Sequence, residues 1–133
     1  MKPEHERLLE TFEACEIENR AFRHRDHLMV AWLYLRRDGP ERGAENVMAG
    51  IRRFAVAKGV PEKYHHTETL FWIRLMAHVI DAHPSIDDFE TVLARVPHLL
   101  DKYLPLRHYR RETIMSPGAR ARWAEPDLLP LPF

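Results

Sequence analysis

Three histidines, His24, His27 and His65, have a spacing that suits imidazole chemistry. His24 and His27 are three residues apart, so on a helix they lie on one face, one turn apart. His65 belongs to a second polar cluster that also contains His66 and Glu68. If the helices that follow these two clusters pack parallel, or meet at one end, the three imidazoles converge on one point.

The chemistry expected at such a point is that of a neutral imidazole. The partial positive charge of a helix N-terminus and burial in an apolar interior both favour the neutral form. A neutral imidazole is what a metal ion, a general base or an uncharged hydrogen-bond donor requires. Three imidazoles with an open position are typical of catalytic zinc, and two imidazoles with a carboxylate are typical of non-haem iron.

The sequence therefore predicts a site for a divalent metal ion, zinc or iron, held by His24, His27 and His65. Glu13 would be the fourth ligand, or an acceptor that fixes the tautomer of one imidazole. Without a metal, one imidazole would be the base and the others would orient it. Further residues that we expect at this pocket are Tyr64, His66, Glu68, Thr69 and Tyr109.

The same histidines also fit a protein without catalysis. The spacing H-x-x-H alone is a weak signal, and the chain contains neither H-E-x-x-H nor the paired E-x-x-H of di-iron helices. The alternative is a small-molecule-binding or protein-interaction module in which the histidines form a buried hydrogen-bond network. Whether the protein is an enzyme stays open at this point.

The other histidines receive structural interpretations. We expect His5, His83 and His98 to be exposed, and His78 to lie at the boundary of an apolar stripe. His108 lies in a stretch rich in arginine.

The elements that must position these residues are helices. Gly and Pro divide the chain into helix-sized pieces, and apolar residues recur within them at three- and four-residue steps. No segment alternates long enough to predict a strand. The sequence predicts an all-α, single-domain bundle of about five helices over residues 1–133, with short loops. The predicted helices span residues 3–16, 24–37, 40–58, 66–82 and 85–96, with shorter ones at 99–104 and 116–123.

Two of these helices are predicted to be central, and both follow a histidine cluster. The helix over 24–37 is apolar nearly all round, which is typical of a buried helix. The proline-spaced tail, residues 124–133, is expected to be extended. This tail would either dock on a second copy of the chain, giving a homo-oligomer, or cover its own bundle.

Composition limits the class of partner. The chain has 133 residues, with 20 Lys and Arg balanced by 20 Asp and Glu, so no overall field attracts nucleic acid or an anionic membrane. Arginines in the last third make a nucleic-acid patch conceivable, but salt bridges with the acidic N-terminal residues explain the asymmetry more simply. The single cysteine, Cys15, excludes an internal disulfide and favours a reducing compartment. We expect a cytoplasmic protein with no membrane partner, whose ligand is a small molecule or a metal ion.

An ordered set of motifs resembles a family of small all-helical bacterial proteins without an assigned function. The motifs are F-x-H-x-D-H-L from Phe22, I-R-R-F-A from Ile51, Y-H-x-T-x-T from Tyr64 and L-L-D from Leu99. The family pattern usually has Glu after the histidine of the third motif, where this chain has His66. If that carboxylate matters, its role here is lost or is taken by Glu68 or His66.

Overall fold

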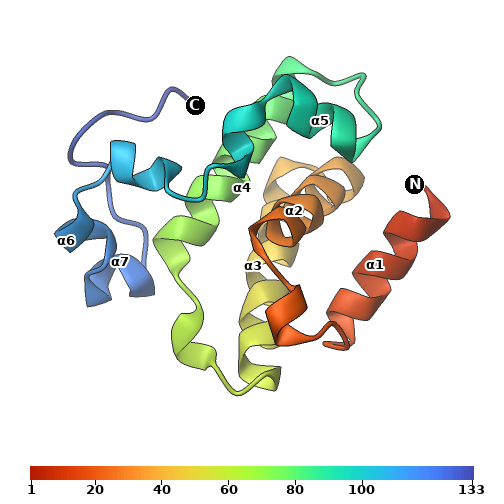
Figure 1. Ribbon diagram of the computed structural model, residues 1–133, viewed down its shortest axis with the longest axis horizontal. Helices are drawn as coiled ribbons and strands as arrows, with labels where there is room; N and C mark the ends of the chain where they lie inside the picture. The colour runs from red at the N-terminus through yellow and green to blue at the C-terminus, as the bar shows by residue number, and fades with distance from the viewer. The chain divides into compact units, whose positions relative to one another are not determined.

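The structure, a computed structural model of residues 1–133, contains seven α-helices, four short 3-10 helices and no strand (Figure 1). This confirms the all-α prediction. The bundle of about five helices is not confirmed, and no α-helix spans the predicted range 99–104, which contains only parts of two 3-10 helices. The chain forms two compact units, residues 1–64 (unit 1) and 65–133 (unit 2). That all 133 residues act as a single domain stays a prediction.

Unit 1 consists of three α-helices and two 3-10 turns. The elements are α1 (Pro3–Glu13), η1 (Asn19–Ala21), α2 (His24–Asp38), α3 (Pro40–Ala57) and η2 (Pro61–Lys63). Three aromatic rings join them: the Phe22 centroid lies 5.2 Å from that of Phe12 and 4.7 Å from that of Phe54. Because the rings come from α1, from the turn before α2 and from α3, their burial holds these segments together.

The start and end of α2 follow from local chemistry. The Asp26 carboxylate accepts a hydrogen bond from the Arg23 backbone N–H (2.9 Å), which satisfies a donor at the start of the helix. At the other end Gly39 has φ 89°, in a region that side chains disfavour, and Pro40 then opens α3. The first helix is shorter than predicted, because α1 ends at Glu13 and Cys15 adopts φ 57°.

The close packing of α2 on α3 depends on a glycine. A Cβ atom at Gly43 would lie 2.7 Å from both the Leu35 Cα and the Tyr34 carbonyl oxygen. Such a distance is well inside van der Waals contact, and both neighbouring atoms belong to the backbone of α2. Only a residue without a side chain allows this approach.

Unit 2 has one long helix and several short ones. The elements are α4 (His66–Ala82), α5 (Phe89–Arg95), η3 (Pro97–Leu100), η4 (Leu104–Arg107), α6 (Arg111–Ile114) and α7 (Pro117–Ala121). The bounds of α4 agree with the prediction. The helix predicted from Ser85 begins later, because Asp88 caps α5 by accepting from the Thr91 N–H (3.1 Å). Ser116 caps α7 as expected, whereas α6 was not predicted.

Residues 122–133 contain no helix and are held on unit 2 by polar contacts. Asp127 accepts hydrogen bonds from the Arg110 N–H (2.8 Å) and from the Thr113 hydroxyl. These hydrogen bonds lower the pKa of Asp127, with that from Thr113 the larger cause. Of the two roles predicted for the tail, these contacts favour the covering of its own unit, while the homo-oligomer stays a prediction.

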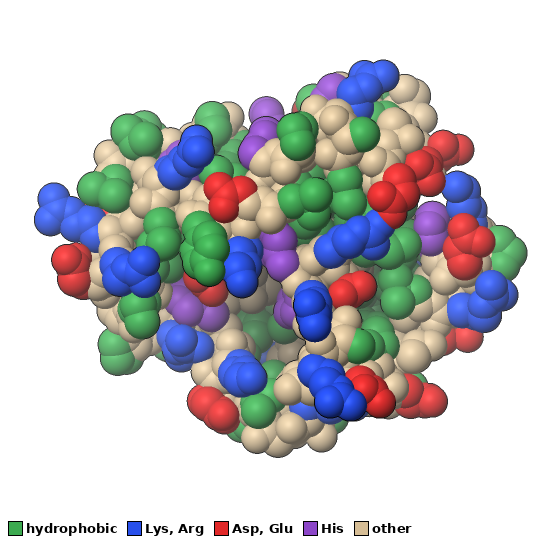
Figure 2. All heavy atoms as spheres, viewed as in Figure 1, with side chains coloured by type: hydrophobic (Ala, Val, Ile, Leu, Met, Phe, Trp, Pro, Cys, Tyr) green, Lys and Arg blue, Asp and Glu red, His purple; other side chains and the backbone are tan.

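The surface carries charges of both signs. On the face drawn in Figure 2, Lys and Arg side chains are interspersed with Asp and Glu. None of the helices is long and apolar enough to cross a membrane.

The glycine contact gives a test of the α2–α3 packing. Gly43→Ala should lower the free energy of unfolding by about 2 kcal/mol through overpacking, although alanine is the better helix former. Ala49→Gly, at an exposed position of α3, should cost about 1 kcal/mol through helix propensity alone. Urea denaturation of both variants measures the difference. A stabilised Gly43→Ala protein would contradict the packing argument.

Candidate functional site

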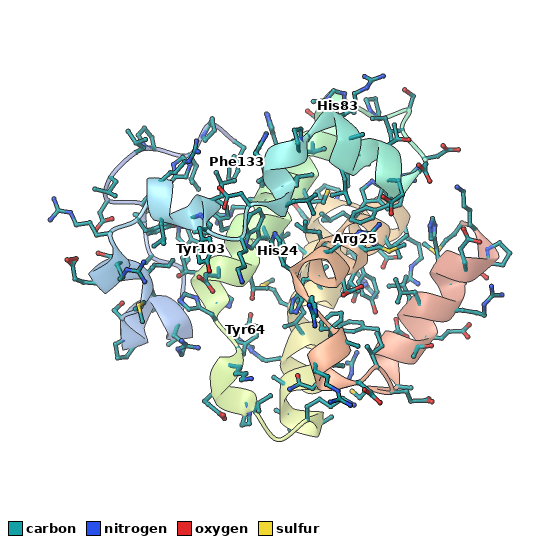
Figure 3. The ribbon with its side chains drawn as sticks, in the orientation of Figure 1. His24, Arg25, Tyr64, His83, Tyr103 and Phe133 are labelled. Atoms are coloured by element: carbon teal, nitrogen blue, oxygen red, sulfur yellow. The ribbon has the colours of Figure 1, made fainter.

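The predicted site residues divide between the two units. In unit 1 lie Glu13, His24, His27 and Tyr64; in unit 2 lie His65, His66, Glu68, Thr69 and Tyr109. Figure 3 shows His24 at the start of α2 and Tyr64 at the end of unit 1. The position of each of these residues is therefore described relative to the other residues of its own unit.

His65 serves as the N-cap of α4. Its Nδ1 accepts a hydrogen bond from the Glu68 backbone N–H (3.1 Å), so the ring proton lies on Nε2. The Nε2–H then donates to the Ile114 carbonyl oxygen, 2.6 Å away in α6. The cap is therefore His65, and His66 is the first residue of the helix. Both nitrogens of His65 are thus bonded within unit 2, and a metal ion would have to displace one of these partners.

The threonines of the same motif also form hydrogen bonds with backbone groups. The buried Thr67 hydroxyl donates to the Ala119 carbonyl (2.6 Å) and accepts from the Ala124 N–H (3.1 Å). Thr69 donates to the His65 carbonyl (2.7 Å). Y-H-x-T-x-T therefore has a structural explanation: its side chains hold α6, α7 and the chain after α7 on the first turn of α4. We call the hydrogen bonds of His65 and Thr67 the α4 clasp.

Tyr109, expected at the pocket, extends the same pattern. Its ring is fully buried, and its hydroxyl donates to the Ala124 carbonyl (2.7 Å). Burial is the main cause that raises the pKa of Tyr109 to about 12, with the Glu125 charge adding to it.

Glu13 is engaged inside unit 1. Its carboxylate accepts a hydrogen bond from the Tyr34 hydroxyl (2.6 Å), which ties the end of α1 to α2. Burial raises the pKa of Tyr34, and the hydrogen bond to Glu13 raises it further. Tyr34 therefore stays protonated and acts as a donor.

Unit 1 contains a cavity of about 410 Å³, within the size range of small-molecule sites. We call it the unit 1 cavity. The residues around it combine an aromatic and aliphatic wall with a few polar groups and two cations. They are Asn19, Arg20, Phe22, His27, Ile51, Phe54, Ala55, Val60, Lys63 and Tyr64.

Three of the motifs that were separate in sequence meet at this cavity. Phe22 and His27 come from the first motif, with ring centroids 4.1 Å apart. Ile51, Phe54 and Ala55 come from the second. The third contributes its first residue, Tyr64, whose ring is covered by the Arg52 guanidinium at 4.6 Å.

His27 lines this cavity, and its pKa departs strongly from the ordinary value. Burial lowers the pKa of His27 to about 4, and the nearby His24 lowers it further, against smaller opposing effects of Asp26 and of the hydrogen bond to the Phe22 backbone. The imidazole is therefore neutral near pH 7. In a neutral imidazole one ring nitrogen is a hydrogen-bond donor and the other carries a lone pair that can accept.

Neither unit contains a group of three or more His, Cys, Asp or Glu side chains placed to hold a metal ion. The metal site of His24, His27, His65 and Glu13 stays a prediction.

Sequence reasoning did not identify several residues of the cavity. Phe22 and Phe54 have the spacing of core residues, and Asn19, Arg20, Val60 and Lys63 lie in turns without a periodic pattern. The available signal was that Phe22 stands in the same motif as His27, and that Phe54 and Tyr64 stand in two further motifs of the same set. No family model, curated protein or solved structure matches the chain.

The neutral state of His27 predicts acid sensitivity. A histidine with an ordinary pKa of 6.5 in the unfolded chain and about 4 in the folded chain binds its proton mainly on unfolding. Stability is therefore lost as the pH falls from 6.5 to 4. Because the side chain is only partly buried, we expect this loss in the free energy of unfolding to be on the order of 2 kcal/mol. His27→Asn should abolish it.

The measurement is urea denaturation at a series of pH values between 4 and 7. Ala49→Gly, at an exposed position without a titratable group, is the control and should keep the wild-type slope. An unchanged slope in His27→Asn would show that His27 is not held neutral.

The α4 clasp predicts a stability effect in unit 2. Thr67→Val keeps the shape but leaves the Ala119 carbonyl and the Ala124 N–H without their partner, so unfolding should become easier by about 2 kcal/mol. Thr11→Val removes an exposed hydroxyl that bonds Arg7 and should change stability by less than about 0.5 kcal/mol. Equal effects of both substitutions in thermal or urea unfolding would contradict the clasp.

Proposed function

We propose that this protein binds a small, flat, largely apolar molecule in the unit 1 cavity, and that His27 accepts a hydrogen bond from a hydroxyl or N–H of that ligand. The observation that carries the proposal is the convergence of Phe22, His27, Phe54 and Tyr64 on one cavity of about 410 Å³. A mostly apolar wall with one or two well-placed polar groups is typical of small-molecule sites.

The wall determines which molecules fit. Phe22 and Phe54 are buried and their rings are tilted by 46° to each other, so they offer aromatic surface to a flat ligand. Arg20 and Lys63 are the charged residues that line the cavity. An anionic substituent on the ligand is therefore compatible with the rim, whereas a cationic one is repelled.

His27 provides the specificity. A lone pair held in a partly buried site favours ligands with a donor over isosteres without one, because the unpaired group costs free energy. The low pKa of His27 keeps this lone pair available near pH 7. A pKa of about 4 makes this imidazole a weak base near pH 7, so the site suits binding of a donor better than general-base catalysis.

Of the functions predicted from the sequence, this proposal takes the small-molecule one. A divalent zinc or iron ion on His24, His27 and His65, with Glu13, stays a separate prediction, as does a cytoplasmic location.

Phenol and its methyl ether, anisole, test the proposal directly. The two molecules have similar rings, but only phenol donates a hydrogen bond. We expect phenol to bind wild-type protein about tenfold more tightly than anisole, as one hydrogen bond predicts. In His27→Phe, which keeps a ring against Phe22, the preference should disappear. Titrations followed by NMR shifts of Phe54 and Tyr64 measure both affinities and locate the site.

The control places the same aromatic ring at an exposed position of unit 1 outside the cavity, Glu45→Phe, which should keep the phenol preference. His27→Gln provides a second variant should His27→Phe fold poorly. Equal affinities for the two molecules, a preference that survives both His27 variants, or no binding at millimolar concentration would each reject the proposal.

A further inference from the structure

Unit 2 contains a second cavity, of about 330 Å³, with four histidines around it. We call it the unit 2 cavity. His78 comes from α4, His83 follows that helix, His98 lies in η3 and His108 follows η4. Four of the nine histidines of the chain thus face one cavity, although they are spread over 31 residues of sequence.

The sequence interpretation of these histidines was partly wrong. His98 is exposed as predicted, whereas His83, which was also predicted to be exposed, is half-buried. The same prediction was wrong for His5, outside this cavity. His5 is buried, and its ring lies edge-on to that of Trp32 with the centroids 5.8 Å apart. His78 and His83 lie five residues apart and His98 belongs to another element. No local pattern relates them, so only the fold shows that they share a cavity.

The charge of the lining has one sign. Arg95, at the end of α5, lines the cavity with the four histidines, and no Asp or Glu does. The floor is apolar, formed by Leu75, Val79 and Leu104. An apolar floor below a set of N–H donors and a guanidinium fits a ligand with an apolar body and an anionic group.

The tail completes the wall. His108 donates from Nδ1 to the Leu129 carbonyl (3.0 Å), and its own carbonyl accepts from the Leu128 N–H (2.9 Å). This anchor precedes Phe133, whose ring packs edge-on to Phe71 at 5.5 Å and lies 6.3 Å from the His78 ring. Phe133 lines the cavity as well, so an aromatic ring is added to the apolar side.

We propose that the unit 2 cavity binds a small organic anion, with Arg95 as the main partner of the anionic group and the imidazoles of His78, His83 and His98 as further donors. This site is independent of the unit 1 cavity and of His27. The histidines do not form a ready metal site, because no group of three ligating side chains is placed around a common point.

Binding should be coupled to protons. An anion beside an imidazole favours its protonated form, so the complex takes up protons at pH 7. The titratable groups that line the cavity are the four histidines and Arg95. His108 contributes only when protonated, since its neutral ring already uses its N–H on Leu129.

Phenyl phosphate and benzoate are suitable probes, because both join an anionic group to an apolar ring and their comparison distinguishes a phosphate from a carboxylate ligand. Benzyl alcohol is the neutral comparator. We expect at least one of the two anions to bind more than tenfold more tightly than benzyl alcohol. Calorimetry in buffers of different ionisation enthalpy should show proton uptake.

Arg95→Gln should weaken binding of that anion about tenfold, as loss of a charge-assisted contact predicts. Arg111→Gln, at an exposed arginine of α6 outside the cavity, should leave it unchanged, and so should His27→Phe, which separates this site from the unit 1 cavity. Failure of both anions to bind at millimolar concentration, equal binding of the alcohol, or equal effects of the two arginine variants would overturn the proposal.

Discussion

The architecture of unit 2 depends on hydrogen bonds from the first turn of α4 to backbone groups far along the chain. Helices of four and five residues, such as α6 and α7, cannot persist alone, because nucleation costs more than so few bonds return. His65 and Thr67 provide partners for one carbonyl of each of these helices, that of Ile114 in α6 and that of Ala119 in α7. The buried polar groups are thereby paired, and the chain after α7 is brought back to α4.

This use of His65 changes how the histidines of the chain are understood. A histidine at a helix start can cap, ligate or accept a proton, and the sequence does not distinguish these roles. In the structure the His65 ring has a partner on each nitrogen, whereas the His27 ring is held neutral at a cavity. The two residues look alike in their motifs, but one positions the fold and the other faces a space where a ligand fits.

Both cavities have linings of the same general kind. Aliphatic and aromatic side chains form most of each wall, and residues of short 3-10 turns complete it. In unit 1 the cavity lies beside η1 and η2, and in unit 2 beside η3 and η4. Their linings differ, because the first places His27 among aromatic rings, whereas the second places Arg95 and four histidines beside an apolar wall. We therefore assign the two cavities different ligands.

The sequence by itself determined the helices whose signals are local. Leu28 to Leu35 mark a buried helix, Gly39 and Pro40 end one helix and begin the next, and α4 has its predicted bounds. Short α6 was missed because four residues carry no periodicity. The sequence also singled out His27 and Tyr64 as site residues. It did not show that Phe22 and Phe54 lie with them at one cavity. Only the tertiary structure decided which imidazoles are hydrogen-bonded and which face a cavity. The outcome depends on contacts such as that of His65 with Ile114, two residues that are 49 positions apart in the sequence. The spacing of neighbouring residues carries no information about such contacts.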